Sequence, residues 1–134
     1  MPSLDTLFEA ARAIQAKAYA PYSRFMVGAA IATADGQVFT GCNVENAAYP
    51  VGACAEAGAI SAMIAGGANR IAQIVVMGEG EHLVTPCGGC RQRIREFASP
   101  DTPIHIAGPE GIRKSFTLDE LLPFSFGPDN LTDR

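Results

Sequence analysis

The sequence predicts an α/β protein, a three-layer α/β/α sandwich in which helices cover both faces of a central sheet. Stretches with helical periodicity alternate along the chain with short β-rich stretches, which is typical of this layered architecture. One β-rich stretch, residues 71–77, is continuously apolar, as expected for a strand that is covered on both faces. Because the chain has 134 residues and shows no repeats or linkers, we expect a single domain over residues 1–134.

The first half of the chain is predicted to contain two helices and a β-hairpin. Apolar residues recur at three- and four-residue steps after Ser3, a residue type that caps helix N-termini. Two β-rich stretches then flank the pair Asp35-Gly36, a strong signal for a hairpin turn. The next helix is almost entirely small and apolar and stops at Gly66-Gly67, so we expect other elements to surround it. The predicted ranges are 4–18 and 53–65 for the helices, and 27–33 and 37–42 for the strands.

The second half is predicted to alternate between strand and helix. Thr117, followed three residues later by Glu120, has the pattern of a capping box at the start of a short last helix. The predicted elements are strands over 71–77 and 103–107 and helices over 88–97 and 117–122, followed by an irregular tail from residue 123.

Composition and charge exclude several classes of function. The chain carries 10 Lys and Arg against 14 Asp and Glu, a net charge of −4, so its surface repels phosphate backbones on average and nucleic acid is not an expected partner. No apolar stretch approaches the ~18 residues of a membrane span, and Asp5 stands where a signal peptide is basic, so we expect a cytoplasmic protein without membrane contact. Charged residues make up only 18% and hydrophobic residues 48%, which favours an oligomer with buried subunit faces.

The spacing of the four cysteines is the most informative pattern. In a reducing compartment, cysteines are more often metal ligands, redox groups or buried thiols than crosslinks. Cys54 opens the predicted helix 53–65, and Cys87 and Cys90 open the next one, so three thiols gather at two helix starts, where free N–H groups stabilise thiolates. Three protein ligands leave the fourth tetrahedral position of zinc open for water, as in catalytic rather than structural sites.

Glu56 is the only charged residue of the apolar helix 53–65. A buried carboxylate is costly to ionise unless a nearby group uses it. Two residues beyond Cys54, Glu56 can reach water on the metal, and this position suits a shuttle that takes a proton from water, delivers it to a ring nitrogen and later protonates a leaving amine. The alternative interpretation is a helix N-terminal carboxylate stabilised by the helix dipole.

Several longer motifs accompany this pattern. Cys54-Ala55-Glu56, followed by Pro86-Cys87-Gly88-Gly89-Cys90, matches the zinc signature of the nucleobase deaminases. Three further stretches are AYAPYSRFMVGAA over 18–30, GCNVENAAY over 41–49 and LLPFSF over 121–126. Taken together and in this order, the motifs resemble the small, homotetrameric zinc-dependent cytidine deaminases of the cytidine and deoxycytidylate deaminase superfamily, over nearly the whole chain.

The resemblance implies a mixed central sheet of about five strands, one Zn²⁺ per chain, and a small-molecule nucleoside substrate. The implied reaction is hydrolytic deamination of cytidine, and of deoxycytidine, to the uridine product and ammonia, a step of pyrimidine salvage. The implied metal ligands are Cys54, Cys87 and Cys90, and the implied catalytic acid and base is Glu56. The implied substrate contacts are Asn43 and Glu45 on the ribose hydroxyls, Phe25 beside the base, Ala55, and Phe126 from a neighbouring subunit of a homotetramer.

Ala57 departs from a common pattern of the resembled family. Many relatives with three cysteine ligands carry Arg directly after the catalytic Glu, and that Arg bonds to the zinc thiolates. Three thiolates around Zn²⁺ leave one net negative charge, so without this Arg the helix N-termini would carry more of the compensation. We therefore expect a less acidic zinc water here than in relatives with Arg.

Other interpretations stay open from the sequence. A thioredoxin-like pair of Cys87 and Cys90 would leave Cys54 unexplained. A structural zinc module would use Cys42 as a fourth ligand, although a buried thiol is favoured there. Among enzymes, the alternatives are a deaminase of another small aminopyrimidine compound and a deaminase that edits polynucleotides, which the negative charge disfavours.

The remaining polar residues have ordinary interpretations. Asn43 and Glu45 could form a turn after the second strand, and the phenylalanines could be core aromatics. Structural roles are expected for His82 and His105. A solvated helix face or a subunit contact is expected for Arg91, Arg93 and Arg95.

Overall fold

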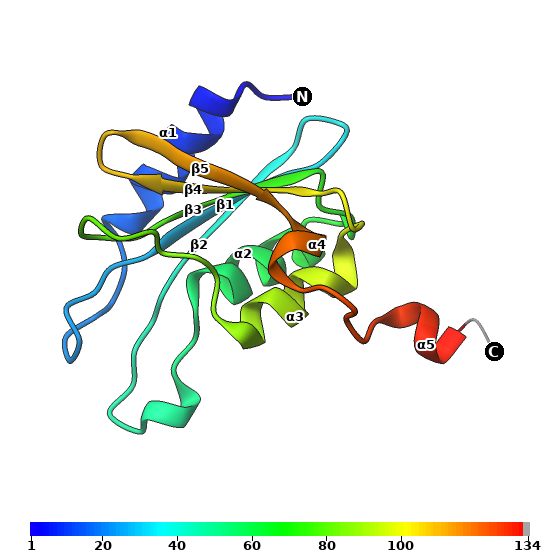
Figure 1. The fold of residues 1–134 in the computed structure, drawn as a ribbon. Coiled ribbons are helices and arrows are strands. Elements are labelled where there is room, and N and C mark those ends of the chain that lie inside the picture. Colours follow the sequence, from blue (N-terminus) through cyan, green and yellow to red (C-terminus); the bar gives the residue numbers. More distant parts are fainter. Residues whose placement is uncertain (133–134) are drawn as a thin grey trace.

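A five-stranded sheet lies between helix α1 on one face and helices α2 and α3 on the other (Figure 1). The structure is a computed structural model, and residues 1–132 are described. The strands are β1 (Gly28–Ala32), β2 (Val38–Cys42), β3 (Gln73–Met77), β4 (Pro103–Gly108) and β5 (Gly111–Thr117). The helices are α1 (Leu4–Gln15), the 3₁₀ turn η1 (Tyr49–Val51), α2 (Ala55–Ala65), α3 (Gly88–Phe97), α4 (Leu118–Leu121) and α5 (Pro128–Thr132).

The sheet is mixed, with the strand order β2-β1-β3-β4-β5. β1 pairs antiparallel with both β2 and β3, and β4 pairs antiparallel with β5, while β3 and β4 run parallel. A parallel pair needs a crossover connection, which α3 supplies between β3 and β4. α2 similarly connects the edge strand β2 to β3. Both connecting helices lie on the same face of the sheet (Figure 1), which brings their N-terminal ends together.

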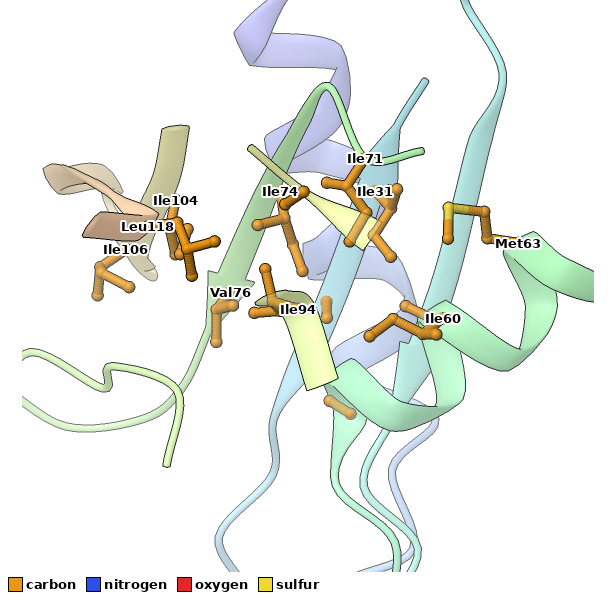
Figure 2. Close-up of a cluster of buried hydrophobic side chains, with 14 residues drawn as sticks. Ile31, Ile60, Met63, Ile71, Ile74, Val76, Ile94, Ile104, Ile106 and Leu118 are labelled. Carbon is orange, nitrogen blue, oxygen red and sulfur yellow. The ribbon is translucent and has the colours of Figure 1, made fainter. Parts of the chain in front are cut away.

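Side chains of the central strands alternate between two hydrophobic clusters, as the period of two in a strand requires. The larger cluster packs Ile60 and Met63 of α2 and Ile94 of α3 against Ile31 and Ile74 of the sheet (Figure 2). On the other face, Leu7, Phe8 and Ala11 of α1 pack against the small or apolar residues Ala30, Ala32 and Val75. Burial on both faces explains the continuously apolar sequence of β3.

Helix α2 lies unusually close to the edge strand β2, and Gly41 permits this approach. A Cβ atom at Gly41 would lie 2.2 Å from the main-chain nitrogen of Ala59 and 2.5 Å from the carbonyl oxygen of Ala55. Both contacts are far inside van der Waals distance, so only glycine fits at this position of the strand. The contact fixes the first two turns of α2 over the sheet.

The expected fold class is confirmed, and so are the predicted elements at their approximate positions. The mixed sheet of five strands that the resemblance implies is also present. Two details were wrong: residue-level patterns missed β5, and the tail expected to be irregular contains α5 (Pro128–Thr132). β5 is an edge strand with charged residues at Arg113, which is half-exposed, and Lys114, which is exposed. It therefore lacks the apolar run that identifies a central strand.

Helix boundaries differ slightly from expectation. α1 ends at Gln15 rather than residue 18, and α2 begins at Ala55, with Cys54 as its N-cap. Thr117 caps α4 through the expected capping box with Glu120. Among the described helices, none is both long enough and apolar enough to cross a membrane.

Candidate metal centre and active site

Three thiols meet where α2 and α3 begin. Cys54 is the N-cap residue of α2, Cys87 is the N-cap residue of α3, and Cys90 lies in the first turn of α3. Their sulfur atoms all lie within 4.8 Å of one another. Cys42 is not part of this group and lies half-buried on β2. The structure thus gathers the three predicted ligands and leaves the fourth cysteine outside.

The geometry and chemistry of the three thiols fit zinc. Ideal tetrahedral zinc with bonds of about 2.3 Å to sulfur separates its sulfur ligands by about 3.8 Å, so small side-chain rotations suffice to close the group. The main-chain N–H of Cys90 donates to the Cys87 sulfur and lowers the pKa of that thiol. Burial raises the pKa of both Cys54 and Cys90. Two of the three thiols therefore ionise readily only beside a cation, which a bound Zn²⁺ provides.

Glu56 lies in the first turn of α2 and is only 4% exposed. Its burial raises the pKa of the carboxyl group, and smaller effects of its own N–H, of Cys90 and of the Arg93 charge oppose this rise. A carboxyl group with a raised pKa gains and loses a proton more easily near neutral pH than an ordinary glutamate. The environment of Glu56 is therefore that of an acid and base rather than that of a solvated helix cap.

A cavity of about 570 Å³ is lined by two of the three grouped cysteines, Cys54 and Cys87. Its lining includes six of the predicted site residues: Asn43, Glu45, Cys54, Ala55, Glu56 and Cys87. Cys90 is fully buried and does not line the cavity. The volume is in the range of small-molecule sites, so the arrangement combines three thiols that can hold a metal, a buried carboxyl group and room for a ligand.

Ala55 contributes a main-chain donor to this cavity. The first hydrogen bond of α2 runs from the N–H of Gly58 to the carbonyl oxygen of Cys54. The N–H of Ala55 precedes this bond and has no acceptor within the helix, as at any helix start. Its N–H can therefore donate to a ligand in the cavity.

The Asn43 side chain has capacity for a further ligand contact. Its Nδ2 donates to the carbonyl oxygen of Phe25 at 2.8 Å, and its Oδ1 accepts from the N–H of Val27 at 2.8 Å. An amide has two donor hydrogens and two acceptor lone pairs, so one of each remains. The turn interpretation of Asn43 and a role in binding are therefore compatible.

Glu45 is held in a similar way. Its Oε1 accepts from the N–H groups of Tyr22 and Ser23, at 3.0 and 3.1 Å, and its Oε2 accepts from the Ser23 hydroxyl. The Ser23 hydroxyl is the largest cause of the lowered pKa of this carboxyl group, followed by the Ser23 N–H. A carboxylate offers about four acceptor sites, so one stays available toward the cavity.

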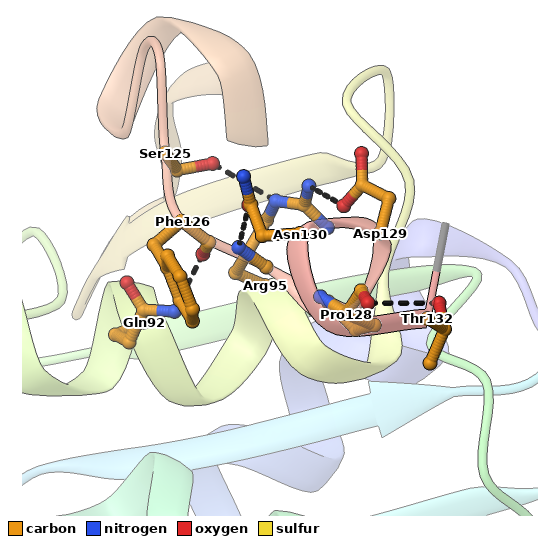
Figure 3. A network of polar contacts seen from close by, with 9 residues as sticks. Gln92, Arg95, Ser125, Phe126, Pro128, Asp129, Asn130 and Thr132 are labelled. Carbon is orange, nitrogen blue, oxygen red and sulfur yellow. Dashed lines mark hydrogen bonds and ion pairs between the residues drawn. The ribbon is translucent and has the colours of Figure 1, made fainter. Parts of the chain in front are cut away.

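Two predicted base contacts do not line the cavity within this chain. Phe25 is half-exposed beside it, and Phe126 lies 58% exposed on the outer side of α3. Figure 3 shows how the C-terminal segment is anchored there: Gln92 donates to the carbonyl oxygen of Phe126 at 2.8 Å, and Arg95 contacts Ser125 and Asp129, each at 2.9 Å. No residue of this segment is among those that line the cavity of its own chain.

The expectation of a solvated arginine face on α3 was wrong for two of three residues. Arg95 anchors the C-terminal segment, as described above. Arg91 is half-buried and donates to the carbonyl oxygens of Pro86 and Leu121, at 2.7 and 2.8 Å, and to the Thr85 hydroxyl at 3.0 Å. Arg91 thereby holds the loop that carries Cys87. Its position one residue after Cys90 gives no sequence signal for the bond to Leu121, which lies thirty residues further along the chain.

Arg93, the third arginine, approaches the metal centre itself. Its Nη1 lies 3.6 Å from the Cys90 sulfur. Sequence reasoning missed this contact, although the spacing of three residues on one helix face could have indicated it. It also missed the apolar and aromatic wall of the cavity, which includes Tyr22, Tyr49, Val27, Val76 and Val84.

The fold and this site define a zinc-dependent deaminase. A mixed sheet with helices on both faces presents three thiols at two helix starts, and a buried glutamate follows the first thiol by two residues. In the zinc deaminases, three such ligands hold the metal and the glutamate, which is not a ligand, transfers protons.

Comparison with known proteins identifies the family. The profile described as "Cytidine and deoxycytidylate deaminase zinc-binding region" matches residues 1–106, which include all three grouped cysteines. The cytidine deaminase of Halalkalibacterium halodurans is 40% identical over 123 residues, 90% of this chain and 93% of that protein. The cytidine deaminase of Sporosarcina psychrophila is 35% identical over 129 residues, 96% of this chain and 95% of that protein. The chain belongs to the cytidine and deoxycytidylate deaminase family.

Solved structures agree with this assignment. The crystal structure of cytidine deaminase from Burkholderia pseudomallei superposes with a TM-score of 0.87 at 42% identity, covering 93% of this chain and 100% of that chain. The crystal structure of the Mycobacterium tuberculosis cytidine deaminase gives a TM-score of 0.81 at 37% identity, covering 95% and 99% of the two chains. The likeness therefore extends over nearly the whole fold.

Proposed function

We propose that this protein is a cytidine deaminase, which converts cytidine and deoxycytidine with water to the uridine product and ammonia. The observation that carries the proposal is the position of Glu56, buried beside three thiols in the wall of a cavity that Asn43 and Glu45 also line. The metal centre and the acid explain the chemistry, and the polar pair explains selection of a nucleoside.

Cys54, Cys87 and Cys90 hold the zinc, and Glu56 moves the protons. Bound zinc supplies a Lewis acid that activates water at neutral pH. Glu56 would accept a proton from the attacking water and deliver it to the ring nitrogen beside C4 of the base. It would then take the second proton from the hydroxyl group added at C4 and give it to the departing amine. The carbonyl group of the product replaces the amine, so one water is consumed and one ammonia is released. The raised pKa of Glu56 supports both directions of proton transfer.

Asn43 and Glu45 bind the sugar through their remaining hydrogen-bonding capacity. An acceptor on Glu45 and a donor and acceptor on Asn43 complement adjacent ribose hydroxyls. The main-chain N–H of Ala55 donates to the base, and Phe25 packs beside it. A sugar contact remote from the metal favours the nucleoside over the free base.

The assembly we propose is a homotetramer in which Phe126 completes a neighbouring cavity. Phe126 is exposed and anchored away from its own cavity, and Phe124 beside it is fully exposed. Tyr49 and Val51 are also exposed large apolar side chains near the cavity. Aromatic residues in such positions are typical of buried interface cores.

We also propose that residues 1–134 act as one domain and that the enzyme works in the cytoplasm, in pyrimidine salvage. The core helices and the site are built on one and the same sheet, which supports a single domain. Three ligand thiols need a reducing compartment to stay available to zinc, which supports the cytoplasm.

The test is release of ammonia from cytidine by purified, zinc-analysed protein, before and after removal of the metal by a chelator. We expect turnover that chelation abolishes and added zinc restores. Glu56→Gln should keep the metal but lose at least ~10²-fold in rate. An active Glu56→Gln variant would contradict the role of Glu56. Comparison with cytosine and with other aminopyrimidine nucleosides decides between cytidine and a related substrate.

A further inference from the structure

The guanidinium of Arg93 contacts a sulfur atom of the metal centre. Its Nη1 lies 3.6 Å from the Cys90 sulfur, within hydrogen-bond range for a sulfur acceptor. Cys90 is otherwise fully buried. Because Arg93 follows Cys90 by three residues on the same helix, the two side chains lie on neighbouring turns of one face. The contact is therefore built into the helix and does not depend on a flexible loop.

Arg93 differs from the other α3 arginines in what it binds. Arg95 pairs with Asp129, and Arg91 donates to main-chain oxygens and a hydroxyl. Within residues 1–132, no carboxylate forms an ion pair with Arg93, and its hydrogen bond goes to sulfur. A thiolate is an anion, so this is a charge-assisted contact once Cys90 ionises.

The backbone beneath the guanidinium leaves room for it. A Cβ atom at Gly89 would lie 3.3 Å from Nη1 of Arg93, a distance at which one of the two groups has to move. Glycine at this position lets the guanidinium lie against the first turn of α3. The Arg93 charge also opposes the raised pKa of Glu56, so its field reaches the acid as well as the thiol.

The contact places a positive charge beside a metal centre that carries a net negative charge. Three thiolates around Zn²⁺ leave one net negative charge in a largely buried site, and Glu56 adds a second when ionised. Ala57, beside Glu56, supplies no positive charge. The N-termini of α2 and α3 supply only partial charges. A full positive charge within contact distance of a ligand sulfur is the stronger compensation.

We propose that Arg93 is a positioning residue of the zinc centre: its guanidinium donates to Cys90 and offsets the net negative charge of the three-thiolate site. A thiolate that accepts a hydrogen bond donates less electron density to the metal, so zinc stays a stronger Lewis acid. The proposal adds a full positive charge to the partial charges of the helix N-termini, which were expected to carry more of the compensation without an arginine at position 57. It rests on the zinc site of the proposed function and not on the identity of the substrate.

The first test measures zinc affinity by competition with a chromophoric chelator. We expect Arg93→Gln to bind zinc about 10- to 100-fold more weakly, in line with other contacts to metal ligands. Arg93→Lys should recover part of the affinity, because it keeps the charge but not the planar fork. The matched control is Arg70→Gln, an exposed arginine at the opposite end of α2 from Cys54, which should bind zinc as the parent does.

The second test is the thiolate-to-metal charge-transfer spectrum of the cobalt-substituted protein. Loss of the hydrogen bond to Cys90 should shift these bands in Arg93→Gln and leave them unchanged in Arg70→Gln. A purely structural role of Arg93 would lower thermal stability without this shift. If Arg93→Gln folds poorly, Arg93→Met keeps the apolar stem and the helix propensity and takes its place.

Unchanged zinc affinity and unchanged cobalt bands in the arginine variants would overturn the proposal. Equal loss of affinity in Arg70→Gln would overturn it as well, since net charge would then account for the effect. Neither measurement involves turnover. A protein that fails to deaminate cytidine can therefore still confirm the role of Arg93, and the two proposals fail separately.

Discussion

The Glu45 carboxylate accepts hydrogen bonds from both the hydroxyl and the main-chain N–H of Ser23. These bonds lower the pKa of Glu45, so the group stays ionised at neutral pH and below. They also tie the loop before β1 to the segment that follows β2. The side chain proposed to bind the sugar therefore has a fixed orientation before any ligand arrives.

The first prediction concerns this carboxylate. Glu45→Gln keeps the size of the side chain but removes its charge, and a hydrogen bond to a charged group is worth about 1.5–3 kcal/mol. We therefore expect kcat/KM for cytidine to fall roughly 10- to 150-fold, mostly through KM. The same measurement with 2′,3′-dideoxycytidine, which lacks the hydroxyls, should show a much smaller loss. Equal losses for the two nucleosides would mean that Glu45 shapes the loop and does not read the sugar.

A second prediction separates the ligand cysteines from the fourth cysteine. Cys87→Ser and Cys90→Ser should lose stoichiometric zinc and activity, because a serine hydroxyl does not ionise to replace a thiolate. Cys42→Ser should retain one zinc per chain and full activity, since Cys42 lies outside the group of three sulfurs. Metal analysis of the purified variants is the measurement. Loss of zinc from Cys42→Ser with an intact fold would indicate a four-cysteine structural site.

The metal centre could be predicted from the sequence, whereas the contacts around it could not. The reason is the separation in sequence between the residues that interact. Cys54, Cys87 and Cys90 stand at helix starts, and helix starts can be located from local patterns. Glu56 is conspicuous because it is the one charge in an apolar helix. By contrast, Arg95 bonds to Ser125, and one of the Arg91 bonds runs to the carbonyl oxygen of Leu121, each thirty residues away. No local spacing encodes such a contact, so both arginines looked like a solvated surface.

The third prediction concerns two glycines at the contact between α2 and β2. Replacement by alanine should destabilise the protein at Gly41 of β2 and stabilise it at Gly58 of α2. Gly41→Ala places a methyl group 2.2 Å from the main-chain nitrogen of Ala59. Neither backbone can move without displacing α2, so we expect a loss of at least ~1–3 kcal/mol in the free energy of unfolding, as for overpacked cores. Weaker zinc binding should accompany it, because α2 carries Cys54.

Gly58→Ala is the matched control in the same contact. A Cβ atom at Gly58 would lie 3.5 Å from the Cα of Gly41, an ordinary contact distance. Replacement of glycine by alanine inside a helix should therefore stabilise the protein by about 0.5–1 kcal/mol. Chemical denaturation of both variants checks the pair. A destabilised Gly58→Ala would show that the approach of α2 tolerates no side chain from either element.

The fourth prediction is a pH dependence of stability that arises from His105. This residue is 8% exposed on β4, its Nδ1 lies 2.6 Å from the Ser115 hydroxyl and its Nε2 lies 3.0 Å from Oε1 of Gln73. Burial lowers its pKa below the usual value, so the native state favours the neutral ring. The unfolded state binds a proton at about pH 6.5, and stability from His105 is therefore complete above this pH and lost as the pH falls below it.

Unfolding free energies of the parent and of His105→Gln, measured in excess zinc from about pH 5 to pH 8, check this sign. The difference between the two proteins should shrink as the pH falls below about 6.5, while shared contributions of the metal cancel. His82→Gln is the control, because His82 lies exposed in a loop. A difference that stays constant with pH would assign His105 a packing role without a titration.

The last prediction tests whether Phe126 acts in a neighbouring subunit. The Glu56→Gln variant keeps Phe126 but lacks the acid, and the Phe126→Ala variant keeps the acid but lacks the ring, so each alone should be impaired. When both variants are co-expressed and assemble together, we expect roughly a quarter of the parent activity. In a randomly assembled symmetric oligomer, about a quarter of the sites combine an intact Glu56 with an intact Phe126 from the neighbouring subunit. Separately purified oligomers, mixed without exchange of subunits, should recover none. If the co-assembled chains have no more activity than this mixture, Phe126 acts within its own chain. The structure argues against that outcome, because Gln92 on α3 anchors the carbonyl oxygen of Phe126 away from the residues that line the cavity.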